Sequence, residues 1–467
     1  MEARMMISCR VNPMERRQFI RCAAAAAVTP LAGTLRADEP GAVELTLDAS
    51  EGRVEGDSWA GWLYTYNGLL PGPVVQARPG DTVRIRLQNR LRESTNLHFH
   101  GLHVPPTGNA DNSFVMAPPG EVFNYEFSIP ADHPPGTFWY HPHVHGSAAR
   151  QVSRGLAGAI LIRGELDAMP AVADSQEYVL VLQDFDLDSQ GYPREPNVMQ
   201  RMAGREGNLV TVSGAVNPAI AVAAGGWVRL RLINASASRS YRLQVEEHPM
   251  AQIANDGGPL PSPQQLDELL LAPGERAEVM IEGDRTPGAY RILNLPYNRG
   301  GMGMIGGVRR VEVLGSLVYA GAAERRIPLP ERLFPVDPLP QPSRRRSFVL
   351  GQGMGMGMMG GMSFSINGRT FNPNRVDTRV RLGDVEEWEF VNPSMMDHPM
   401  HVHTNPFQVV DAAGASEPTW KDVVLVRAGS RVRVRMKFSD YAGRTFYHCH
   451  ILDHEDLGMM GILEIQG

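Results

Sequence analysis

The segment His448-Cys449-His450, near the C-terminal end of the chain, joins two residue types that bind transition metals. Successive side chains of an extended strand point to opposite faces, so Cys449 faces one way and the two histidines face the other. His454 and Met459 follow in what reads as a loop that can fold back onto the cysteine face. A thiolate, two imidazoles and a weak methionine ligand are the set that forms a blue-copper electron-transfer site. The segment therefore predicts such a site, with one more imidazole required from elsewhere in the chain.

Three further histidine motifs lie upstream of this segment. His98-Phe99-His100 and His141-Pro142-His143 each place two imidazoles on one face of a strand, as positions two apart do. The third motif, His398–His403, repeats this spacing at its end, while a proline after its first histidine lets His398 leave that face and join Cys449. A buried thiol between surface histidines would explain Cys449 alone, but not four motifs together.

The twelve candidate ligands divide into two sets. His398, Cys449, His454 and Met459 form the predicted mononuclear type 1 site. The other ligands are four pairs of histidines, two pairs from each end of the chain: His98, His100, His141, His143, His401, His403, His448 and His450. Eight imidazoles are too many for one ion and suit three copper ions.

Residues 1–37 read as a twin-arginine export signal, which predicts a periplasmic protein. Arg16-Arg17 precede an apolar run of 14 residues, 22–35, which is too short to span a bilayer. Leu35-Arg36-Ala37 suits a small-residue cleavage site. A disordered basic N-terminus is the alternative. Removing the segment leaves Cys449 as the only cysteine, so we expect no internal disulfide.

Composition argues against nucleic acid as a partner. Beyond residue 37 the chain carries 39 basic and 49 acidic residues, a balance that repels a polyanion. No other apolar run is long enough to cross a membrane, so we expect no membrane insertion. We also expect the protein to act as a monomer.

The rest of the sequence predicts an all-β fold that repeats one unit. Residues 83–87 alternate apolar side chains with arginine, as a half-buried strand does. The same design recurs at 228–232 after Asn217-Pro218, and at 380–390 after Asn372-Pro373. The predicted organisation is three consecutive β-sandwich domains at 38–168, 169–316 and 347–467, with a linker at 317–346.

The middle domain is predicted to be a spacer without copper ligands. It contains only His248 and no cysteine. His103, His133 and His145 also match no ligand position, although His145 extends the alternation of the second histidine motif.

The four motifs together resemble those of the multicopper oxidases, the family of laccases, bilirubin oxidases and bacterial cuprous oxidases. The resemblance covers the chain from about residue 45 to the end. It implies cupredoxin-like Greek-key domains and four copper ions: one type 1, one type 2 and two type 3. His98 and His401 would hold the type 2 ion. The type 3 pair would take His100, His141, His143, His403, His448 and His450.

The resemblance also implies a reaction. A reducing substrate gives single electrons to the type 1 copper, and these pass through Cys449 to its neighbours His448 and His450. Four electrons reduce dioxygen to two waters. Glu455 is a candidate proton relay, and Asp111 is a candidate carboxylate that would hydrogen-bond a ligating imidazole and fix its tautomer. A solvated loop charge is the alternative for either acid.

A segment of glycine and methionine, 351–362, lies where the bacterial cuprous oxidases carry a methionine-rich insert, although here it is short and rich in glycine. Thioethers are soft donors that suit Cu(I). The candidate ligands for Cu(I) as a substrate are Met354, Met356, Met358, Met359 and Met362. A flexible linker is the alternative.

Three functions follow from these features. The first is a periplasmic cuprous oxidase for copper tolerance with additional laccase activity, and Met395 and Met396 add thioethers beside His398. The second is a laccase for phenols, in which Asp397 accepts a hydrogen bond from the substrate. The third is a non-catalytic cupredoxin-fold scaffold or copper store, which the complete ligand set disfavours.

Overall fold

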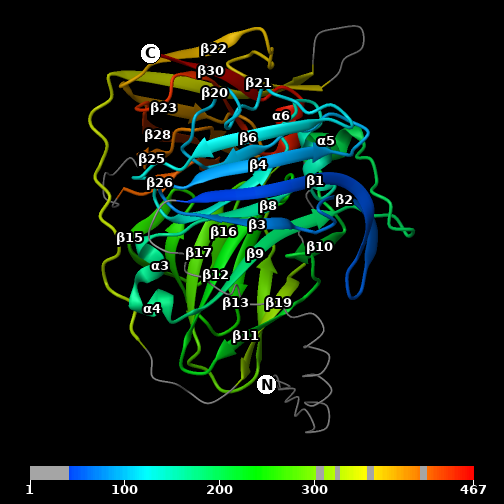
Figure 1. Cartoon of the computed structure of the whole chain (residues 1–467), viewed down its shortest axis with the longest axis vertical. Coiled ribbons are helices and arrows are strands. Elements are labelled where there is room, and N and C mark those ends of the chain that lie inside the picture. Colours follow the sequence, from blue (N-terminus) through cyan, green and yellow to red (C-terminus); the bar gives the residue numbers. More distant parts are fainter. Residues whose placement is uncertain (1–40, 301–309, 321–326, 355–361, 411–417) are drawn as a thin grey trace, which may run out of the picture.

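The computed structural model describes residues 41–300, 310–320, 327–354, 362–410 and 418–467 (Figure 1). The expected export signal lies outside these ranges, and so do Met356, Met358 and Met359. In the described part of the chain, three β-sandwiches follow one another, as predicted. Figure 1 shows the third sandwich beside the first at one end of the molecule and the second at the other end.

Unit 1 packs two four-stranded sheets face to face, in the orders β2-β1-β4-β6 and β3-β8-β7-β5. Its strands are β1 (Ala42–Glu55), β2 (Ala60–Tyr66), β3 (Gly72–Ala77), β4 (Thr82–Asn89), β5 (His98–His100), β6 (Val122–Ser128), β7 (Gly136–His141) and β8 (Gly158–Ile162). Three short helices belong to it or follow it: α2 (Ala148–Ser153), α3 (Glu165–Ala168) and α4 (Pro170–Ala173).

Unit 2 has sheets of six and five strands, in the orders β10-β9-β12-β17-β14-β15 and β11-β19-β18-β13-β16. The bounds are β9 (Gln176–Phe185), α5 (Val198–Ala203), β10 (Leu209–Val212), β11 (Ala219–Ala223), β12 (Trp227–Asn234), β13 (Tyr241–Val245), β14 (Met250–Asn255), β15 (Gly258–Leu266), β16 (Leu269–Leu271), β17 (Arg276–Glu282), β18 (Ala289–Leu295) and β19 (Glu312–Ala320).

Unit 3 repeats that design in the orders β21-β20-β23-β28-β25-β26 and β22-β30-β29-β24-β27. The bounds are β20 (Arg344–Met354), β21 (Met362–Ile366), β22 (Val376–Arg381), β23 (Val385–Val391), β24 (His398–Val402), β25 (Phe407–Val410), β26 (Trp420–Lys421), β27 (Val423–Val426), β28 (Arg431–Lys437), β29 (Gly443–Cys449), α6 (Leu452–Asp456) and β30 (Met460–Gln466).

The repeat is visible in the pairing of the first strand of each unit. β1, β9 and β20 each pair in parallel with the unit's next long strand, β4, β12 and β23. A tight turn with positive φ at both central residues follows the second strand each time, at Asn67-Gly68, Ser213-Gly214 and Asn367-Gly368. Asparagine and glycine tolerate this backbone best. The sequence instead suggested Asn217-Pro218 and Asn372-Pro373 as the repeated turn. Both lie a few residues after the turn that the three units share.

Each unit has its own apolar core between its two sheets. In β4, Val83, Ile85 and Leu87 are buried while Arg84 and Arg86 are exposed, which confirms the predicted half-buried strand. Each fully buried aliphatic side chain of this kind contributes about 1.5–3 kcal/mol to stability.

The equivalent strand of unit 2 is different. Arg229 and Arg231 of β12 are 1% and 0% exposed, so the face expected to meet water is buried. It packs near β7 of unit 1. Glu278 of β17, in the same sheet of unit 2, pairs with Arg229 at 2.5 Å and with Arg231 at 2.6 Å. Asp167 on α3 pairs with the same two arginines at 2.7 and 2.5 Å. The alternation of apolar residues and arginines correctly predicted that β12 has an apolar face and a charged face. The charged face is buried because unit 1 covers it.

This ion-pair network predicts a loss of stability in acid. Burial alone would raise the pKa of Glu177, but Arg231 and Arg163 outweigh burial and lower it to about 2. Because the pKa is about 4.3 in the unfolded chain, the ionised carboxylate stabilises the fold above that pH, and the stabilisation is lost as the pH falls toward 2. We expect Glu177→Gln to lower the free energy of unfolding by about 1–3 kcal/mol at pH 7 and by about half as much at pH 3.

Urea unfolding of both proteins at the two pH values measures this difference. Glu126→Gln is the control, because Glu126 pairs with Arg84 on the surface, where both side chains are about half exposed, and such pairs contribute little. A destabilisation by Glu177→Gln that stays constant between pH 7 and pH 3 would contradict the assignment.

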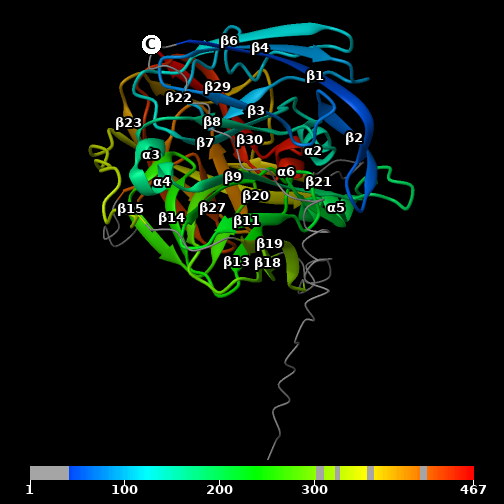
Figure 2. The ribbon, with the colours of Figure 1, turned by 60° about the horizontal axis from the view of Figure 1, so that its bottom comes forward.

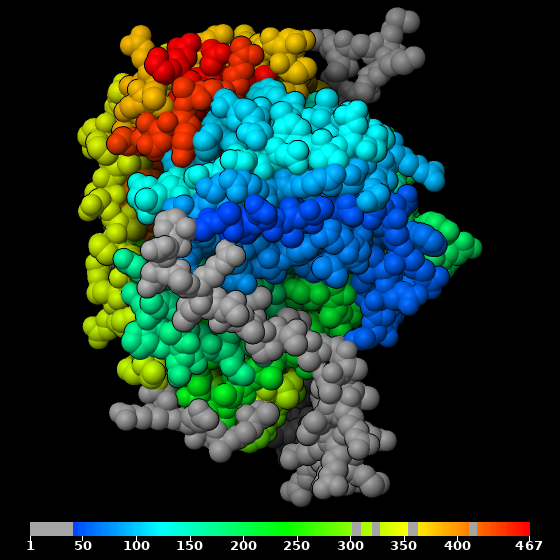
Figure 3. Space-filling model, viewed as in Figure 1, coloured from blue at the N-terminus to red at the C-terminus, as the bar shows by residue number. Residues whose placement is uncertain are grey.

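Two connections complete the arrangement. Residues 327–343 run without regular structure along one side of the molecule, from unit 2 to unit 3 (Figure 1). Helix α6 of unit 3 contacts both α2 and α5, so the three units meet at these helices (Figure 2). In the space-filling view, unit 1 covers the middle of the visible face between units 3 and 2 (Figure 3). No helix among the described residues is both long and apolar enough to span a bilayer.

Candidate metal centre

Three of the four predicted type 1 ligands converge inside unit 3. Met400 of β24 pairs with Cys449 of β29, which brings His398, at the start of β24, close to the cysteine. Cys449 Sγ lies 3.5 Å from His398 Nδ1 and 3.8 Å from His454 Nδ1, and the two Nδ1 atoms are 3.3 Å apart. All three side chains are fully buried.

The protonation of this cluster fits a cation at its centre. His454 Nε2 donates to the carbonyl of Met202, which leaves Nδ1 as a lone pair directed at the other two ligands. Burial lowers the pKa of His398 to about 3, so its ring is neutral. Burial also raises the pKa of the Cys449 thiol, so a thiolate there requires a compensating positive charge. One soft thiolate and two imidazole lone pairs at these distances suit copper.

The segment after Cys449 corrects one expectation. His454 lies on the short helix α6 rather than in a loop. Met459 then returns to the cysteine: its N–H donates to the carbonyl of His454 at 2.8 Å, and its carbonyl accepts from Cys449 N at 3.0 Å. Its side chain is fully buried in the same core as Cys449.

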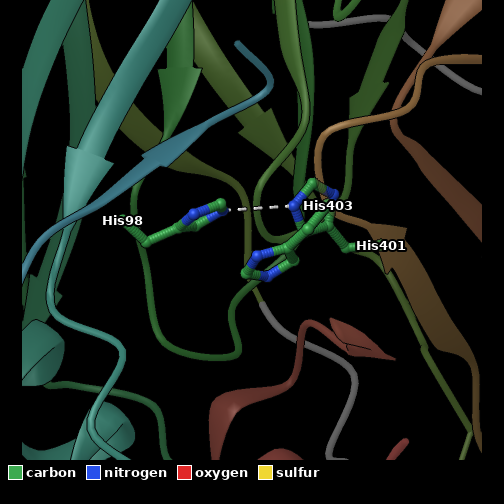
Figure 4. Close-up of side chains that lie close together, drawn as sticks. All are labelled: His98, His401 and His403. Atoms are coloured by element: carbon green, nitrogen blue, oxygen red, sulfur yellow. Dashed lines mark hydrogen bonds between the residues drawn. The ribbon is translucent and has the colours of Figure 1, made fainter. Parts of the chain in front are cut away.

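The eight remaining histidines meet between units 1 and 3. They come from β5, β7 and the loop after it, and from β24 and β29 and the residues that follow them. Each is at most 2% exposed. Figure 4 shows His98 of unit 1 pointing toward His401 and His403 of unit 3. The structure therefore brings together all eight histidines predicted from the four motifs.

The ring contacts within this cluster suit a cation held between the rings. His98 Nε2 lies 3.4 Å from His401 Nε2. The Nδ1 atom of His401 contacts the carbonyl of Asp422 at 2.8 Å and therefore carries the proton, and His98 Nδ1, 3.0 Å from Asp111, carries its proton when Asp111 is ionised. The two facing Nε2 atoms are then both lone pairs, which repel unless a metal ion separates them.

The other rings repeat this arrangement. His448 Nε2 lies 3.1 Å from His143 Nε2 and 3.0 Å from His403 Nε2. His100 Nδ1 lies 3.4 Å from His141 Nε2. Residue triplets that could hold an ion include His98 with His401 and His403, His98 with His100 and His141, and His143 with His403 and His448.

His450 completes the cluster. Its ring centroid is 4.9 Å from that of His100 and 5.5 Å from that of His141. Neither of its ring nitrogens has a hydrogen-bond partner among the residues that the structure describes, although His450 is buried. A buried imidazole without a partner is costly, and a metal ion at this position would satisfy it.

Burial also sets the charge of the cluster. It lowers the pKa of His143 to about 4 and that of His448 to about 3, and it holds the pKa of His98 well below the ordinary value. These three rings are therefore neutral at physiological pH, which is the form that binds metals.

Two buried acids contact these rings. Glu455 of α6 places Oε2 3.1 Å from His448 Nδ1 and Oε1 3.7 Å from His143 Nε2, and burial raises its pKa. Asp111 accepts from Phe99 N at 2.9 Å and contacts His98 Nδ1, and burial raises its pKa to about 8. Both acids are buried, which excludes the alternative that either is a solvated charge in a loop.

The four other histidines have structural contacts instead. His103 binds the carbonyl of Thr404 and the carboxylate of Asp440, which joins units 1 and 3. His248 contacts the hydroxyl of Tyr319. The other two contacts are those of His133 Nδ1 with the carbonyl of Pro134 and of His145 with the ring of Phe371.

Asp397 is placed differently from the expectation for a phenol oxidase. It is 7% exposed. Its Oδ2 accepts from the hydroxyl of Tyr297 at 2.5 Å, and its Oδ1 accepts from Ala428 N at 2.9 Å. Each oxygen thus already accepts one hydrogen bond within the protein, and the side chain is largely buried.

Asp422 was missed in the sequence. Its carboxylate lies 3.0 Å from His100 Nε2, and its carbonyl contacts His401. A Lys-Asp pair before an apolar strand is common and carries no metal signature. Only the pairing of β24 with β27, which sets Val423 opposite His401, brings Asp422 to the histidines.

Comparison with known proteins agrees with this geometry. Sequence models of the family described as "Multicopper oxidase" match residues 49–167, 177–322 and 344–466. The chain is 30% identical over 446 residues to the multicopper oxidase mco of Staphylococcus aureus, covering 92% of this chain and 90% of that one. It is 31% identical over 421 residues to the cell division protein FtsP of Xenorhabdus nematophila, covering 85% and 84%.

Among solved structures, a multicopper oxidase of Campylobacter jejuni, described as a metallo-oxidase, superposes with a TM-score of 0.83. It is 32% identical and covers 94% of both chains. These matches confirm the predicted all-β fold of three cupredoxin-like domains. The chain is a bacterial member of the multicopper oxidase family and an oxidoreductase enzyme.

Proposed function

We propose that this protein is an exported oxidase with four copper ions that couples oxidation of Cu(I) in the periplasm to the reduction of dioxygen to water, with additional activity on phenols. His398, Cys449, His454 and Met459 would hold the type 1 ion. His98 and His401 would hold the type 2 ion. The eight histidines between units 1 and 3 are called the histidine cage below. Its six members other than His98 and His401 would hold the type 3 pair: His100, His141, His143, His403, His448 and His450.

One observation carries the proposal. Cys449 belongs to the thiolate cluster, while His448 and His450, its direct neighbours in the chain, belong to the histidine cage. Copper ions, when bound, would accept single electrons from the reducing substrate and supply four to dioxygen. The backbone on either side of Cys449 then gives the shortest covalent path between the two centres.

The residues of the cage have separate tasks in this scheme. Asp111 and the carbonyl of Asp422 hold the Nδ1 protons of His98 and His401, and so direct both Nε2 atoms inward. Glu455, buried between His143 and His448, can hold a proton at its carboxyl group and release it toward the cage. The surrounding burial excludes bulk water from the histidines.

The path to the type 1 cluster favours Cu(I) over phenols as the substrate. His454 Nε2 is occupied by the carbonyl of Met202, and both imidazoles of the cluster are buried. The ring of Phe364 on β21 stacks on His454, with centroids 3.8 Å apart. Met354 of β20 pairs with Met362 of β21 where the two strands end. Met362 is two residues from Phe364, a distance of about 7 Å along an extended strand. Met395, three residues before His398, is 63% exposed.

A second candidate is a scaffold without oxidase activity, and some relatives of the chain are named as cell division proteins. A scaffold does not need metal ligands. Here all twelve ligand residues are present. Apart from Met459, they converge in two clusters through contacts between nitrogen or sulfur atoms or between rings. The oxidase is therefore the better supported function.

Oxygen uptake by the copper-loaded protein tests the proposal. We expect turnover with Cu(I) to exceed turnover with a substituted phenol. Changing Met354, Met356, Met358, Met359 and Met362 together to leucine should lower Cu(I) oxidation at least about tenfold, since soft ligands are lost, and should leave phenol oxidation nearly unchanged. Equal losses of activity with both substrates would indicate that the segment is a flexible linker and does not bind Cu(I). No oxygen uptake with either substrate would favour the scaffold.

A further inference from the structure

Arg276 of unit 2 lies where the three units meet. The side chain is 1% exposed, at the start of β17. Its Nε donates to the carbonyl of Thr137 in unit 1 at 3.1 Å, and its Nη2 donates to the carbonyl of Asp256 in unit 2 at 2.7 Å. Its two Nη groups donate to the carboxylate of Asp422 in unit 3 at 2.7 and 2.5 Å. One guanidinium thus binds all three units.

Asp422 connects this arginine to the histidine cage. Asp422 Oδ1, which accepts from Arg276, lies 3.0 Å from His100 Nε2. A carboxylate oxygen can only accept, so His100 Nε2 donates to it and Nδ1 is left as the lone pair that faces His141. The orientation of His100 therefore depends on a fixed Asp422.

Arg276 also fixes the position of Asp422, because its two Nη groups each donate to a different oxygen of the carboxylate. A planar guanidinium that binds both carboxylate oxygens fixes the carboxylate in one orientation, which a lysine cannot do.

Two glycines show how closely unit 2 approaches the cage. A Cβ on Gly274, two residues before Arg276, would lie 3.0 Å from the ring of His450 and 3.1 Å from that of His100. A Cβ on Gly101, next to His100, would lie 2.7 Å from Asp422 Oδ2 and would also collide with Arg276. Both glycines have positive φ. The turn before β17 is therefore part of the wall around the histidines.

We infer that Arg276 is a positioning residue for the copper cage: it fixes Asp422, which sets the tautomer and orientation of His100. The middle domain then does more than separate the outer two, although it supplies no predicted ligand. This inference rests on the proposed function.

The test compares copper retention in wild-type protein, Arg276→Met and Arg229→Met. Arg229 is the matched control because it is also 1% exposed and paired with carboxylates, with no contact to the histidines among its hydrogen bonds and ion pairs. Each copper-loaded protein is titrated with a chelator, while copper content, the EPR spectrum and the blue absorption of the type 1 site are followed.

We expect Arg276→Met to release cage copper at a chelator concentration about 10–100-fold lower than wild type, as loss of a partner of a ligating histidine does. The blue absorption should persist in all three proteins, and Arg229→Met should release cage copper as wild type does. Equal retention in Arg276→Met and wild type would overturn the inference, and so would equal early release by both variants.

If Arg276→Met does not fold, Arg276→Lys decides the question in the same titration. Lysine keeps the charge but cannot bind both carboxylate oxygens as arginine does. The chelator concentration that releases cage copper should therefore be lower than in wild type and higher than in Arg276→Met. Wild-type retention by Arg276→Lys would overturn the inference. A wild-type protein that binds only one copper would instead overturn the proposed function, and the inference with it.

Discussion

Cys449→Ser should abolish both the blue colour and the oxidase activity while leaving the protein folded. The cysteine provides the only thiolate of the type 1 cluster, and a serine hydroxyl is too weak an acid to replace it. The side chains have nearly the same size, and Ile451 N, which lies 3.4 Å from Sγ, can still donate to the hydroxyl oxygen. Visible absorption, oxygen uptake and circular dichroism measure the three properties.

The histidine cage provides the internal control for this variant. Its eight histidines remain, so the variant should keep the copper of the cage and lose one copper ion per chain. A Cys449→Ser protein that is still blue and still consumes oxygen with Cu(I) would reject the assignment of the type 1 site.

Glu455→Gln should slow the reduction of dioxygen by about 10²–10⁴-fold, the usual contribution of a positioned acid or base. Burial raises the pKa of Glu455, so the carboxyl group holds a proton to a higher pH than an exposed glutamate does. Glutamine has the same shape but cannot release a proton. In wild type the rate should fall as the pH rises through the raised pKa, and in Glu455→Gln this dependence should disappear.

Stopped-flow absorption separates this effect from a general loss of structure. Bleaching of the blue colour by substrate should be unchanged in Glu455→Gln, while its return on addition of oxygen should be slow. Asp453→Asn is the matched control, because Asp453 is a buried acid of the same helix that pairs with Arg205 rather than with the histidines. Normal return of colour in Glu455→Gln would exclude Glu455 as a proton carrier.

Much of this arrangement could be predicted because ligand type and strand periodicity act over a few residues. The pairs His98 with His100 and His401 with His403 share a face by the two-residue period of a strand, and the structure puts them in one cluster. Cys449 lies on the opposite face from His448 for the same reason. The convergence of motifs about 300 residues apart was inferred from their number and from the family resemblance.

The features that were missed depend on contacts between domains. Arg229 and Arg231 alternate with apolar residues just as Arg84 and Arg86 do, and no local pattern tells which pair a neighbouring domain will cover. Asp422 likewise gains its role from Arg276, which lies 146 positions earlier in the chain. Long-range ion pairs of this kind leave no period or spacing in a sequence.

The division of the cage between units 1 and 3 has a consequence for biosynthesis. Domains of a growing chain generally fold in order of synthesis, so unit 1 can form while His401, His403, His448 and His450 have not yet been translated. During that interval four neutral imidazoles of unit 1 stand without their counterparts, as half of a chelator. The complete set of eight cage ligands thus exists only after the ribosome has delivered unit 3.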